Sequence, residues 1–365
     1  MSYLFTSESV SEGHPDKVAD AISDAVLDLI MAKQDTALRC ACETLVTTNR
    51  VVVAGEYKGV LNTQEVDSAI RKVIKDVGYE QSGFDWRTAE ITNLLHGQSA
   101  DIAMGTDNFG AGDQGLMFGY ACKETDTYMP SAIYWSHKIV EGLTQARKNG
   151  LLTFLGPDAK SQVTFEYNDD GTPNRIAKVV CSTQHSEETD IETVRKVVSA
   201  FIRNILPGTL VDNDTEFYIN PTGRFVVGGP DGDCGLTGRK IIVDTYGGYS
   251  PHGGGAFSGK DPTKVDRSAA YLTRWIAKNI VAGGYADWAS VQISYAIGMA
   301  QPMSFYIESN GDSRKLTATV QDLVDMTPKG IIDRFDLFRP IYSSTTNYGH
   351  FGKDYLPWEK IDLFD

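Results

Sequence analysis

The sequence has few cysteines and no long hydrophobic run. Its 365 residues include five cysteines, and none of them forms a Cys-x-x-Cys pair, so neither a disulfide framework nor a thiolate metal site is expected. No stretch reaches the roughly 18 apolar residues of a membrane-spanning helix, and the N-terminus lacks the basic start and apolar core of a secretion signal. We therefore predict a cytoplasmic protein without a membrane partner.

Positive charge is scarce as well. The chain carries 34 Lys and Arg residues against 48 Asp and Glu residues, a formal net charge of −14 at pH 7. A nucleic-acid-binding protein needs a basic face or stripe, so no nucleic-acid partner is expected. Between residues 224 and 267, however, six cations stand against five acids. An acidic protein that gathers its cations in one stretch can attract an anionic ligand there.

Glycine is concentrated in that same stretch. Twelve of the 35 glycines lie between residues 223 and 259, and residues 253–261 read GGGAFSGKD. Glycines let backbone N–H groups approach an anion, and Lys260 adds a positive charge beside them. We predict a polyphosphate cradle at this point, to which the alternative is a flexible, solvated loop.

Hydrophobic periodicity predicts alternating helices and strands. Apolar residues at helical spacing predict helices at 15–33, 63–77, 133–147, 191–205 and 264–282. Apolar alternation predicts strands at 39–48, 51–57, 161–167, 177–183, 216–220, 225–227, 241–243 and 291–297. The length and the order of these elements indicate an α/β protein of the α+β type with three similar mixed units. We expect domains at 1–98, 116–228 and 229–365, with a mobile active-site loop at 99–115 as the first boundary.

Polar residues at the start of the first helix form a candidate site. His14, Asp16 and Lys17 surround Pro15, where unpaired backbone N–H groups favour a metal-bound phosphate. An acid at a helix start is also favoured by the helix dipole alone. Two glutamates, Glu43 and Glu56, interrupt apolar strands, and a strand carboxylate usually lies on the solvent face. These residues by themselves leave both readings open.

Six ordered blocks give the chain a close resemblance to the S-adenosylmethionine synthetase (methionine adenosyltransferase) family. The first block, residues 5–17, reads FTSESVSEGHPDK. The other blocks are GAGDQG at 110–115, DAKSQV at 158–163, NPTGRF at 220–225, GDCGLTGRK at 232–240 and GGGAFSGKD at 253–261. They follow the family order over nearly the whole chain.

The resemblance implies an enzyme that transfers the adenosyl group of ATP to the sulfur of L-methionine. The released triphosphate is then split to diphosphate and phosphate, and the product serves one-carbon metabolism. The family's fold has three similar α/β domains in a pseudo-threefold arrangement, assembled from non-contiguous segments. The resemblance also implies a homodimer or homotetramer with the active site between subunits.

Site residues carry over position by position where the motifs match. The implied catalytic residues are His14, Lys160, Arg239 and Lys260. The implied ATP contacts are His14, Asp158, Lys160, Arg224, Phe225, Asp233, Arg239, Lys240, Ala256 and Lys260. The implied methionine contacts are Glu56, Gln98, Asp233 and Lys264. For metals, the resemblance implies two Mg²⁺ ions, with Asp16 as a ligand and Asp266 as a candidate second ligand, and K⁺ at Glu43.

Two departures from the family pattern bear on these expectations. The stretch after Asp101 is shorter than in bacterial relatives, which puts the kinetics of the lid in question. The sequence also ends soon after residues 358–360. This puts the role of a longer C-terminal helix in question, but it affects none of the six motifs.

Two rival classes compete with this reading. The spacing from Gly254 to Gly259 and Lys260 satisfies most of the P-loop pattern, but Asp261 stands where Ser or Thr is required, and no apolar strand leads into the loop. The second rival is a non-catalytic nucleotide-binding protein of the same fold. The intact His14 and Lys160 count against it, and methionine-dependent release of phosphate from ATP would exclude it.

Overall fold

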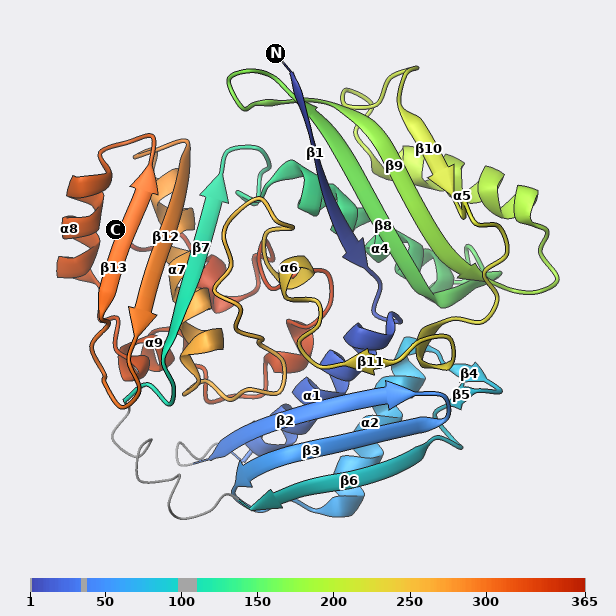
Figure 1. Ribbon diagram of the computed structural model, residues 1–365, viewed down its shortest axis with the longest axis horizontal. Helices are drawn as coiled ribbons and strands as arrows, with labels where there is room; N and C mark the ends of the chain where they lie inside the picture. Colours follow the sequence, from blue (N-terminus) through green and yellow to red (C-terminus); the bar gives the residue numbers. More distant parts are fainter. Residues whose placement is uncertain (1, 34–37, 98–109, 365) are drawn as a thin grey trace.

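Three β-sheets surround a common centre, and each carries helices on one face (Figure 1). The computed structural model describes residues 2–33, 38–97 and 110–364. We call the sheets the N-terminal, central and C-terminal sheets. A separate ribbon pairs β4 (Glu80–Gln81) with β5 (Phe84–Asp85). The three mixed helix and sheet units confirm the predicted α/β class of the α+β type.

The N-terminal sheet has the strand order β11-β2-β3-β6, and its helices α1 and α2 share one core with it. Pro15 begins α1 at a position where a missing backbone N–H is tolerated. Asn62 caps α2 by accepting the Gln64 N–H at 2.8 Å. The elements are β2 (Arg39–Thr47), β3 (Arg50–Lys58), β6 (Glu90–Gly97), β11 (Gly235–Leu236), α1 (Pro15–Met31) and α2 (Thr63–Val77).

The central sheet has the order β1-β8-β9-β10, with α4 and α5 on one face. One stripe of α5, formed by Val194, Val198 and Ile202, is fully buried, as its four-residue spacing predicts. The elements are β1 (Tyr3–Val10), β8 (Leu155–Tyr167), β9 (Pro173–His185), β10 (Glu216–Ile219), α4 (Ser131–Lys148) and α5 (Ile191–Ile205).

The C-terminal sheet has the order β13-β12-β7 and packs against α7. Helix α7 is buried over most of its surface because the sheet lies on one side and the C-terminal residues around Trp358 lie on another. The elements are β7 (Gly115–Cys122), β12 (Trp288–Tyr295), β13 (Ser304–Ser309), α7 (Val265–Ala282), α8 (Ser313–Leu323) and α9 (Pro328–Phe335).

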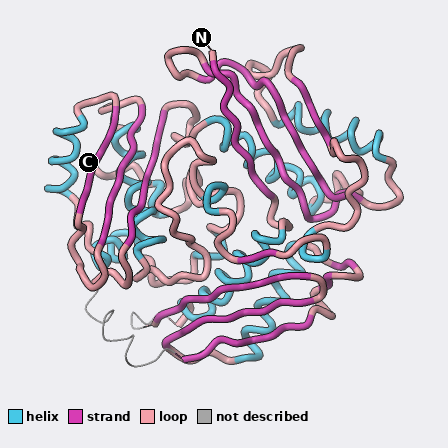
Figure 2. Tube along the Cα trace, viewed as in Figure 1, coloured by secondary structure: helices cyan, strands magenta, loops and turns pink. Residues whose placement is uncertain are grey.

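The sheets exchange single strands between distant parts of the chain. Strand β1 pairs with β8 of the central sheet, β11 pairs with β2 of the N-terminal sheet, and β7 pairs with β12 of the C-terminal sheet. The domain boundaries expected after residues 98, 115 and 228 stay a prediction. Loops occupy much of the space between the three sheets (Figure 2).

Two predicted strands are wrong. Residues 241–243 lie in the short helix α6 (Ile241–Asp244), because a run of three β-branched residues is ambiguous and burial of Val243 and Asp244 decides its conformation. Residues 225–227 form no strand, although Phe225 exchanges backbone hydrogen bonds with the His185 backbone and ring. The predicted helices at 63–77 and 191–205 are confirmed at both ends.

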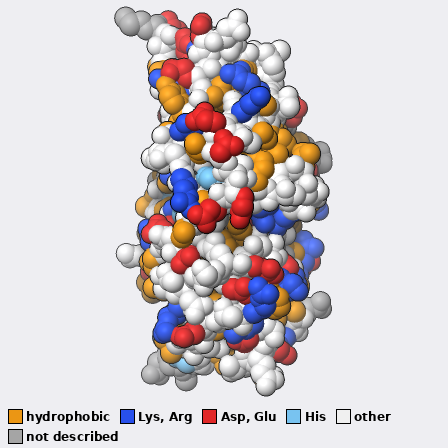
Figure 3. Space-filling view, turned by 90° about the vertical axis from the view of Figure 1, so that its right-hand side faces the viewer, with side chains coloured by type: hydrophobic (Ala, Val, Ile, Leu, Met, Phe, Trp, Pro, Cys, Tyr) orange, Lys and Arg blue, Asp and Glu red, His pale blue; other side chains and the backbone are white. Residues whose placement is uncertain are grey.

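The surface and the thiols agree with the composition. On the side drawn in Figure 3, acidic and basic side chains lie next to one another, with hydrophobic atoms between them. All five cysteines are free thiols, and four of them are buried. In the part of the chain that the structure describes, every helix is too short or too polar to cross a membrane.

Candidate active site

Two glycine-rich segments lie along one edge of strand β2. The first segment, residues 235–240, contains β11, in which Leu236 pairs with Leu45. The second segment, residues 253–261, forms a bridge between Lys260 and Ala41. It is fastened by the Cys42 N–H, which donates to the Gly259 carbonyl at 3.0 Å. The two stretches that carry the predicted cations therefore sit side by side on the same strand.

The segments also touch each other, and this contact requires glycine. A Cβ atom on Gly238 would lie 2.6 Å from the Cβ of Ala256, and the φ of Gly238 is +77°. A Cβ atom on Gly259, whose φ is +80°, would overlap the Cys42 carbonyl oxygen. Only glycine adopts these conformations without strain and leaves room for the neighbouring chain. The glycines thus allow close packing here, beyond any role in approaching an anion.

The open face of the N-terminal sheet, opposite its helices, carries charged side chains. Side chains alternate between faces along a strand, and Glu43 pairs with Ala54 while Ala41 pairs with Glu56. Glu43 and Glu56 therefore share a face with Lys260, which lies opposite Ala41. The same face carries two exposed leucines, Leu94 and Leu236.

A first cation cluster forms around Asp16 at the start of α1. The Lys240 ammonium forms a hydrogen-bonded ion pair with Oδ2 of Asp16, and Arg239 lies 3.6 Å from Oδ1. The Leu236 N–H donates to Oδ1 at 3.0 Å. Burial raises the pKa of Asp16, but the hydrogen bonds from Lys240 and Leu236 outweigh it and bring that pKa below its usual value. Asp16 is therefore a buried carboxylate that remains charged.

His14 belongs to this cluster and is neutral. Burial and the nearby Lys240 lower the pKa of His14 to about 3. Its Nδ1 accepts the Asp16 N–H at 3.2 Å, so the ring proton lies on Nε2. His14 thus has one N–H donor left for a ligand.

Two further predicted ATP contacts lie near the first cluster. Asp158 accepts the Gly229 N–H at 2.8 Å, and burial followed by repulsion from Asp233 raises the pKa of Asp158 to about 6. Lys160 pairs with Glu8 at 2.9 Å and contributes to the lowered pKa of His14. The central sheet therefore adds one cation and one acid to this side of the site.

A second cation cluster surrounds Lys260. Its ammonium lies 2.6 Å from Oδ2 of Asp266, which lies in the first turn of α7. Lys264 forms a hydrogen-bonded ion pair with the buried Asp261. Burial raises the pKa of Glu43, and Lys260 opposes that rise. A Cβ atom on Gly255 would come within 2.6 Å of the Asp266 carboxyl carbon, so the glycines also pack against this cluster.

The remaining predicted residues lie apart from the clusters or cannot be placed. Glu56 faces His96 across 3.7 Å. Arg224 pairs with Glu187 at the surface, and Phe225 bonds to His185. Gln98 and residues 99–109 of the mobile loop expected at 99–115 lie outside the described residues. Residues 110–114 form no helix or strand, and Gly115 begins β7.

Lys17 does not face a ligand, which corrects the grouping of His14, Asp16 and Lys17. Its ammonium is buried and lies 3.0 Å from Asp20 and 2.6 Å from Asp244. Burial lowers the pKa of Lys17, but the two carboxylates outweigh it and raise that pKa. Asp20 and Asp24 were not among the predicted site residues, although aspartates recur at every fourth position from 16 to 28.

The carboxylates fit Mg²⁺ only together with a phosphate ligand. Within the described ranges, no group of three or more His, Cys, Asp or Glu side chains could hold a metal ion. Asp16 and Asp266 each face a lysine instead. Mg²⁺ is commonly held by one or two carboxylates plus substrate phosphates. Two separate carboxylates, each beside a lysine, suit that mode.

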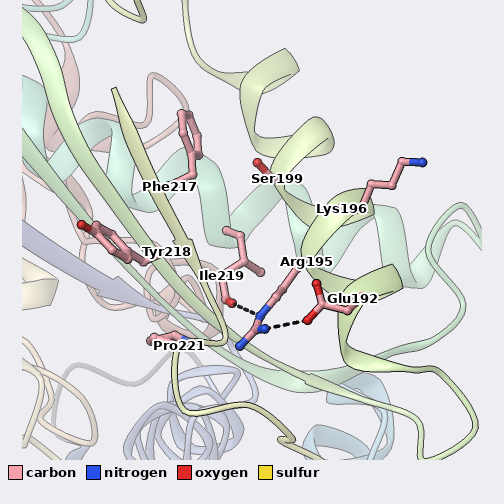
Figure 4. A pocket seen from close by; sticks show the side chains of 8 residues that line it. All are labelled: Glu192, Arg195, Lys196, Ser199, Phe217, Tyr218, Ile219 and Pro221. Atoms are coloured by element: carbon pink, nitrogen blue, oxygen red, sulfur yellow. Dashed lines mark hydrogen bonds and ion pairs between the residues drawn. The ribbon is translucent and has the colours of Figure 1, made fainter. Parts of the chain in front are cut away.

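A large surface hollow lies elsewhere on the molecule. It has a volume of about 570 Å³ and lies between α5 and β10, with Arg195 bridging Glu192 and the Ile219 carbonyl (Figure 4). None of the predicted site residues lines it. The P-loop alternative also fails on the fold, because residues 247–258, which are all described, contain no strand leading into the glycines.

The fold and these clusters define a protein of three mixed helix and sheet units, in which two cation-bearing glycine segments lie along one strand. Three family profiles match the chain: the S-adenosylmethionine synthetase N-terminal domain at residues 2–100, the central domain at 108–225 and the C-terminal domain at 227–360. The chain is 55% identical over 380 residues to the S-adenosylmethionine synthase of Rhodospirillum centenum, covering 100% of this chain and 97% of the relative. It is 54% identical to that of Paramagnetospirillum magneticum, with coverage of 100% and 97%, and 53% identical to that of Cereibacter sphaeroides, with coverage of 100% and 98%.

The chain therefore belongs to the S-adenosylmethionine synthetase family. It is an enzyme, a methionine adenosyltransferase, and its function is the synthesis of S-adenosylmethionine. The resemblance identified from the six sequence blocks is confirmed.

Proposed function

We propose that the methionine sulfur attacks the ribose C5′ of ATP directly. The new S–C5′ bond forms as the C5′–O bond breaks, and the electron pair leaves with the triphosphate, which water then splits to diphosphate and phosphate. A thioether carries no proton, so its attack requires no general base. Alignment of sulfur, carbon and departing oxygen in a closed site can supply roughly 7–11 kcal/mol.

The cations of the two glycine segments support this reaction. Negative charge grows on the leaving triphosphate, and fixed positive charges stabilise it best when they are already in place. Lys240 and Arg239 are held against Asp16, and Lys260 is held against Asp266. Lys160 would add a further charge from the central sheet. The neutral His14 would donate its Nε2–H to the triphosphate near the breaking bond.

An exchange of partners explains the paired charges. When the triphosphate enters, Lys240 and Lys260 would turn to its oxygens, and Asp16 and Asp266 would be free to hold two Mg²⁺ ions. Bound Mg²⁺ would neutralise phosphate charge. Glu43 would hold K⁺. Burial raises the pKa of Glu43 and so disfavours its charged carboxylate, and a bound cation would favour that charged form. We assign the rest of ATP to Asp158, Arg224, Phe225, Asp233 and Ala256.

We assign methionine to the open face of the N-terminal sheet. Glu56 would bind the ammonium group, Lys264 and Gln98 the carboxylate, and Asp233 would face both ligands. Glu56, Glu43 and Lys260 share an exposed sheet face with Leu94, which is 56% exposed. We infer that a second copy of the chain covers this face and closes the site in a homodimer, alone or within a tetramer.

The observation that carries the proposal is that the two glycine segments, which carry Lys240 and Lys260, lie along the same edge of β2. To test it, the protein is incubated with ATP, methionine, Mg²⁺ and K⁺, and S-adenosylmethionine and phosphate release are followed together. In ATP labelled with ¹⁸O at the C5′ bridging position, all label should appear in the phosphate products. Phosphate release without methionine and without a sulfonium product would favour a nucleoside triphosphatase. Binding of ATP without any turnover would favour a non-catalytic nucleotide-binding protein.

A further inference from the structure

Helix α1 presents an aspartate at every fourth position, and each carboxylate accepts backbone N–H groups from another segment. Residues four apart lie on the same face of a helix, so these carboxylates form one stripe along α1. The stripe consists of Asp16, Asp20, Asp24 and Asp28. We call it the aspartate stripe.

Asp20 anchors the first glycine segment. Its Oδ1 accepts a hydrogen bond from the Gly238 N–H at 2.8 Å, and its Oδ2 accepts one from the Lys17 ammonium at 3.0 Å. The side chain is fully buried. Gly238 directly precedes Arg239 and Lys240, so this hydrogen bond fixes the backbone at the base of both cations.

Asp24 anchors the second glycine segment in the same way. Its Oδ1 accepts the Gly259 N–H at 2.9 Å, and Gly259 directly precedes Lys260. Arg267 donates to both carboxylate oxygens, at 2.7 and 3.1 Å. One guanidinium nitrogen of Arg267 also donates to the Phe257 carbonyl at 3.0 Å. The buried ion pair of Asp24 and Arg267 therefore holds the second glycine segment on both sides of Gly259.

The two anchors set the spacing of the cations. The anchored residues, Gly238 and Gly259, both have left-handed φ angles, so the chain turns sharply at each anchor. Asp20 and Asp24 are separated by one turn of a rigid helix, about 6 Å along its axis. The relative position of Lys240 and Lys260 is thus determined by α1 as well as by the edge of β2.

We propose that Asp20 and Asp24 are positioning residues that hold the two cation-bearing segments at the spacing required by one triphosphate. They touch no ligand themselves and act through Gly238 and Gly259. This inference rests on the proposed function, because that function gives both segments the same ligand.

Asp28 provides a matched control. It accepts the Tyr342 and Ser343 N–H groups at 3.0 and 2.8 Å, and that segment carries no predicted site residue. Replacement of Asp20 by alanine leaves Lys17 paired with Asp244, so no buried charge is stranded. Asp20→Ala and Asp28→Ala should therefore remove comparable backbone anchors, one from a cation-bearing segment and one from a neutral segment.

The experiment measures kcat, the KM for ATP, the Kd for inorganic tripolyphosphate with Mg²⁺ and the thermal midpoint of each variant. We expect Asp20→Ala to lower kcat/KM for ATP by about 10- to 100-fold, since small misplacements cost this much, and to weaken tripolyphosphate binding. Asp28→Ala should lose a similar amount of thermal stability and keep both functional values near wild type. Asp20→Asn keeps an oxygen that can accept the Gly238 N–H, so it should recover part of the loss.

Asp24 requires a paired change, because its removal alone leaves Arg267 buried without a counter-charge. Asp24→Ala combined with Arg267→Met should weaken tripolyphosphate binding as Asp20→Ala does. If the double variant does not fold, the Asp20 variants decide the proposal. Equal losses of kcat/KM for ATP and of tripolyphosphate binding in Asp20→Ala and Asp28→Ala would overturn it. If the wild type makes no S-adenosylmethionine, the proposed function fails, and tripolyphosphate binding still decides the role of Asp20.

Discussion

The Lys17 ammonium lies 2.6 Å from Oδ1 of Asp244, a residue 227 positions later in the chain, and both side chains are buried. This pair joins the first turn of α1 to α6, directly after the first glycine segment. Lys17 also pairs with Asp20. One lysine is therefore shared by two buried carboxylates beneath the candidate site.

Replacement of Lys17 should destabilise the whole fold. Lys17→Met leaves Asp20 and Asp244 without their cation, and breaking a buried pair from one side costs about 3–5 kcal/mol. The exposed pair of Lys72 and Asp76 on α2 provides the comparison, and Lys72→Met should cost less than about 1 kcal/mol. Denaturant unfolding of both variants measures the difference, and equal free energies of unfolding would refute the assignment.

Gly235 should tolerate no larger residue. A Cβ atom there would overlap the Pro15 carbonyl oxygen and lie 2.7 Å from Val46 Cγ2. Overpacking of this kind costs about 1–3 kcal/mol, and it should also push β11 away from Asp16. We expect Gly235→Ala to lower both the thermal midpoint and kcat/KM. Gly208→Ala, at a position with open space around it, should change neither. A fully active Gly235→Ala protein would contradict this packing argument.

Lys260 should matter for catalysis much more than for stability. Its pair with Asp266 is partly exposed, so Lys260→Met should unfold near the wild-type midpoint. Loss of one preorganised charge that stabilises a transition state costs about 10²- to 10³-fold in kcat, and we expect a loss of that size. Lys178→Met removes a comparable surface lysine, paired with Glu216 on the central sheet, and should retain wild-type kcat. A small effect at Lys260 would remove it from the catalytic residues.

His137 should make the protein sensitive to acid. Its Nδ1 bonds to the Ser9 hydroxyl at 2.7 Å inside the core, and burial lowers the pKa of His137 to about 3. The unfolded chain takes up this proton near pH 6.5, so the contribution of His137 to stability falls as pH drops from there toward 3. His137→Asn removes that dependence. The free energy of unfolding of the wild type, relative to the variant, should therefore fall by about 1.4 kcal/mol per pH unit between pH 6 and 4.5. A constant difference over that range would show that the ring is protonated in the native state.

Leu94 should lie in the interface between two copies. It is 56% exposed on the open face of the N-terminal sheet, beside Glu56 and His96. Leu94→Glu would place a charge on the face that we propose a second copy covers. We therefore expect the mass measured by sedimentation to fall from that of an oligomer toward that of one chain. Leu151→Glu, at an even more exposed leucine after α4, should leave the mass unchanged. A monomeric wild type would disprove the shared site.

Local patterns predicted much of the fold. The helices at 63–77 and 191–205 have strong apolar periodicity and a capping residue, and both begin and end as predicted. The errors at 225–227 and 241–243 fall where three apolar residues fit either a strand or a buried turn. The strands β1 and β7 were missed because their partners, β8 and β12, lie far away in the chain.

The sequence by itself determined the family, the glycine and cation content of the site and the existence of three mixed units, because motifs and periodicity are properties of neighbouring residues. Only the tertiary structure showed that Lys17 is buried, that Glu43, Glu56 and Lys260 share one face, and that the aspartate stripe holds both glycine segments. Each of these depends on at least one contact between residues more than 200 positions apart, such as Lys17 with Asp244 or Asp24 with Gly259. Such contacts follow from burial and strand register, which the folded chain fixes as a whole.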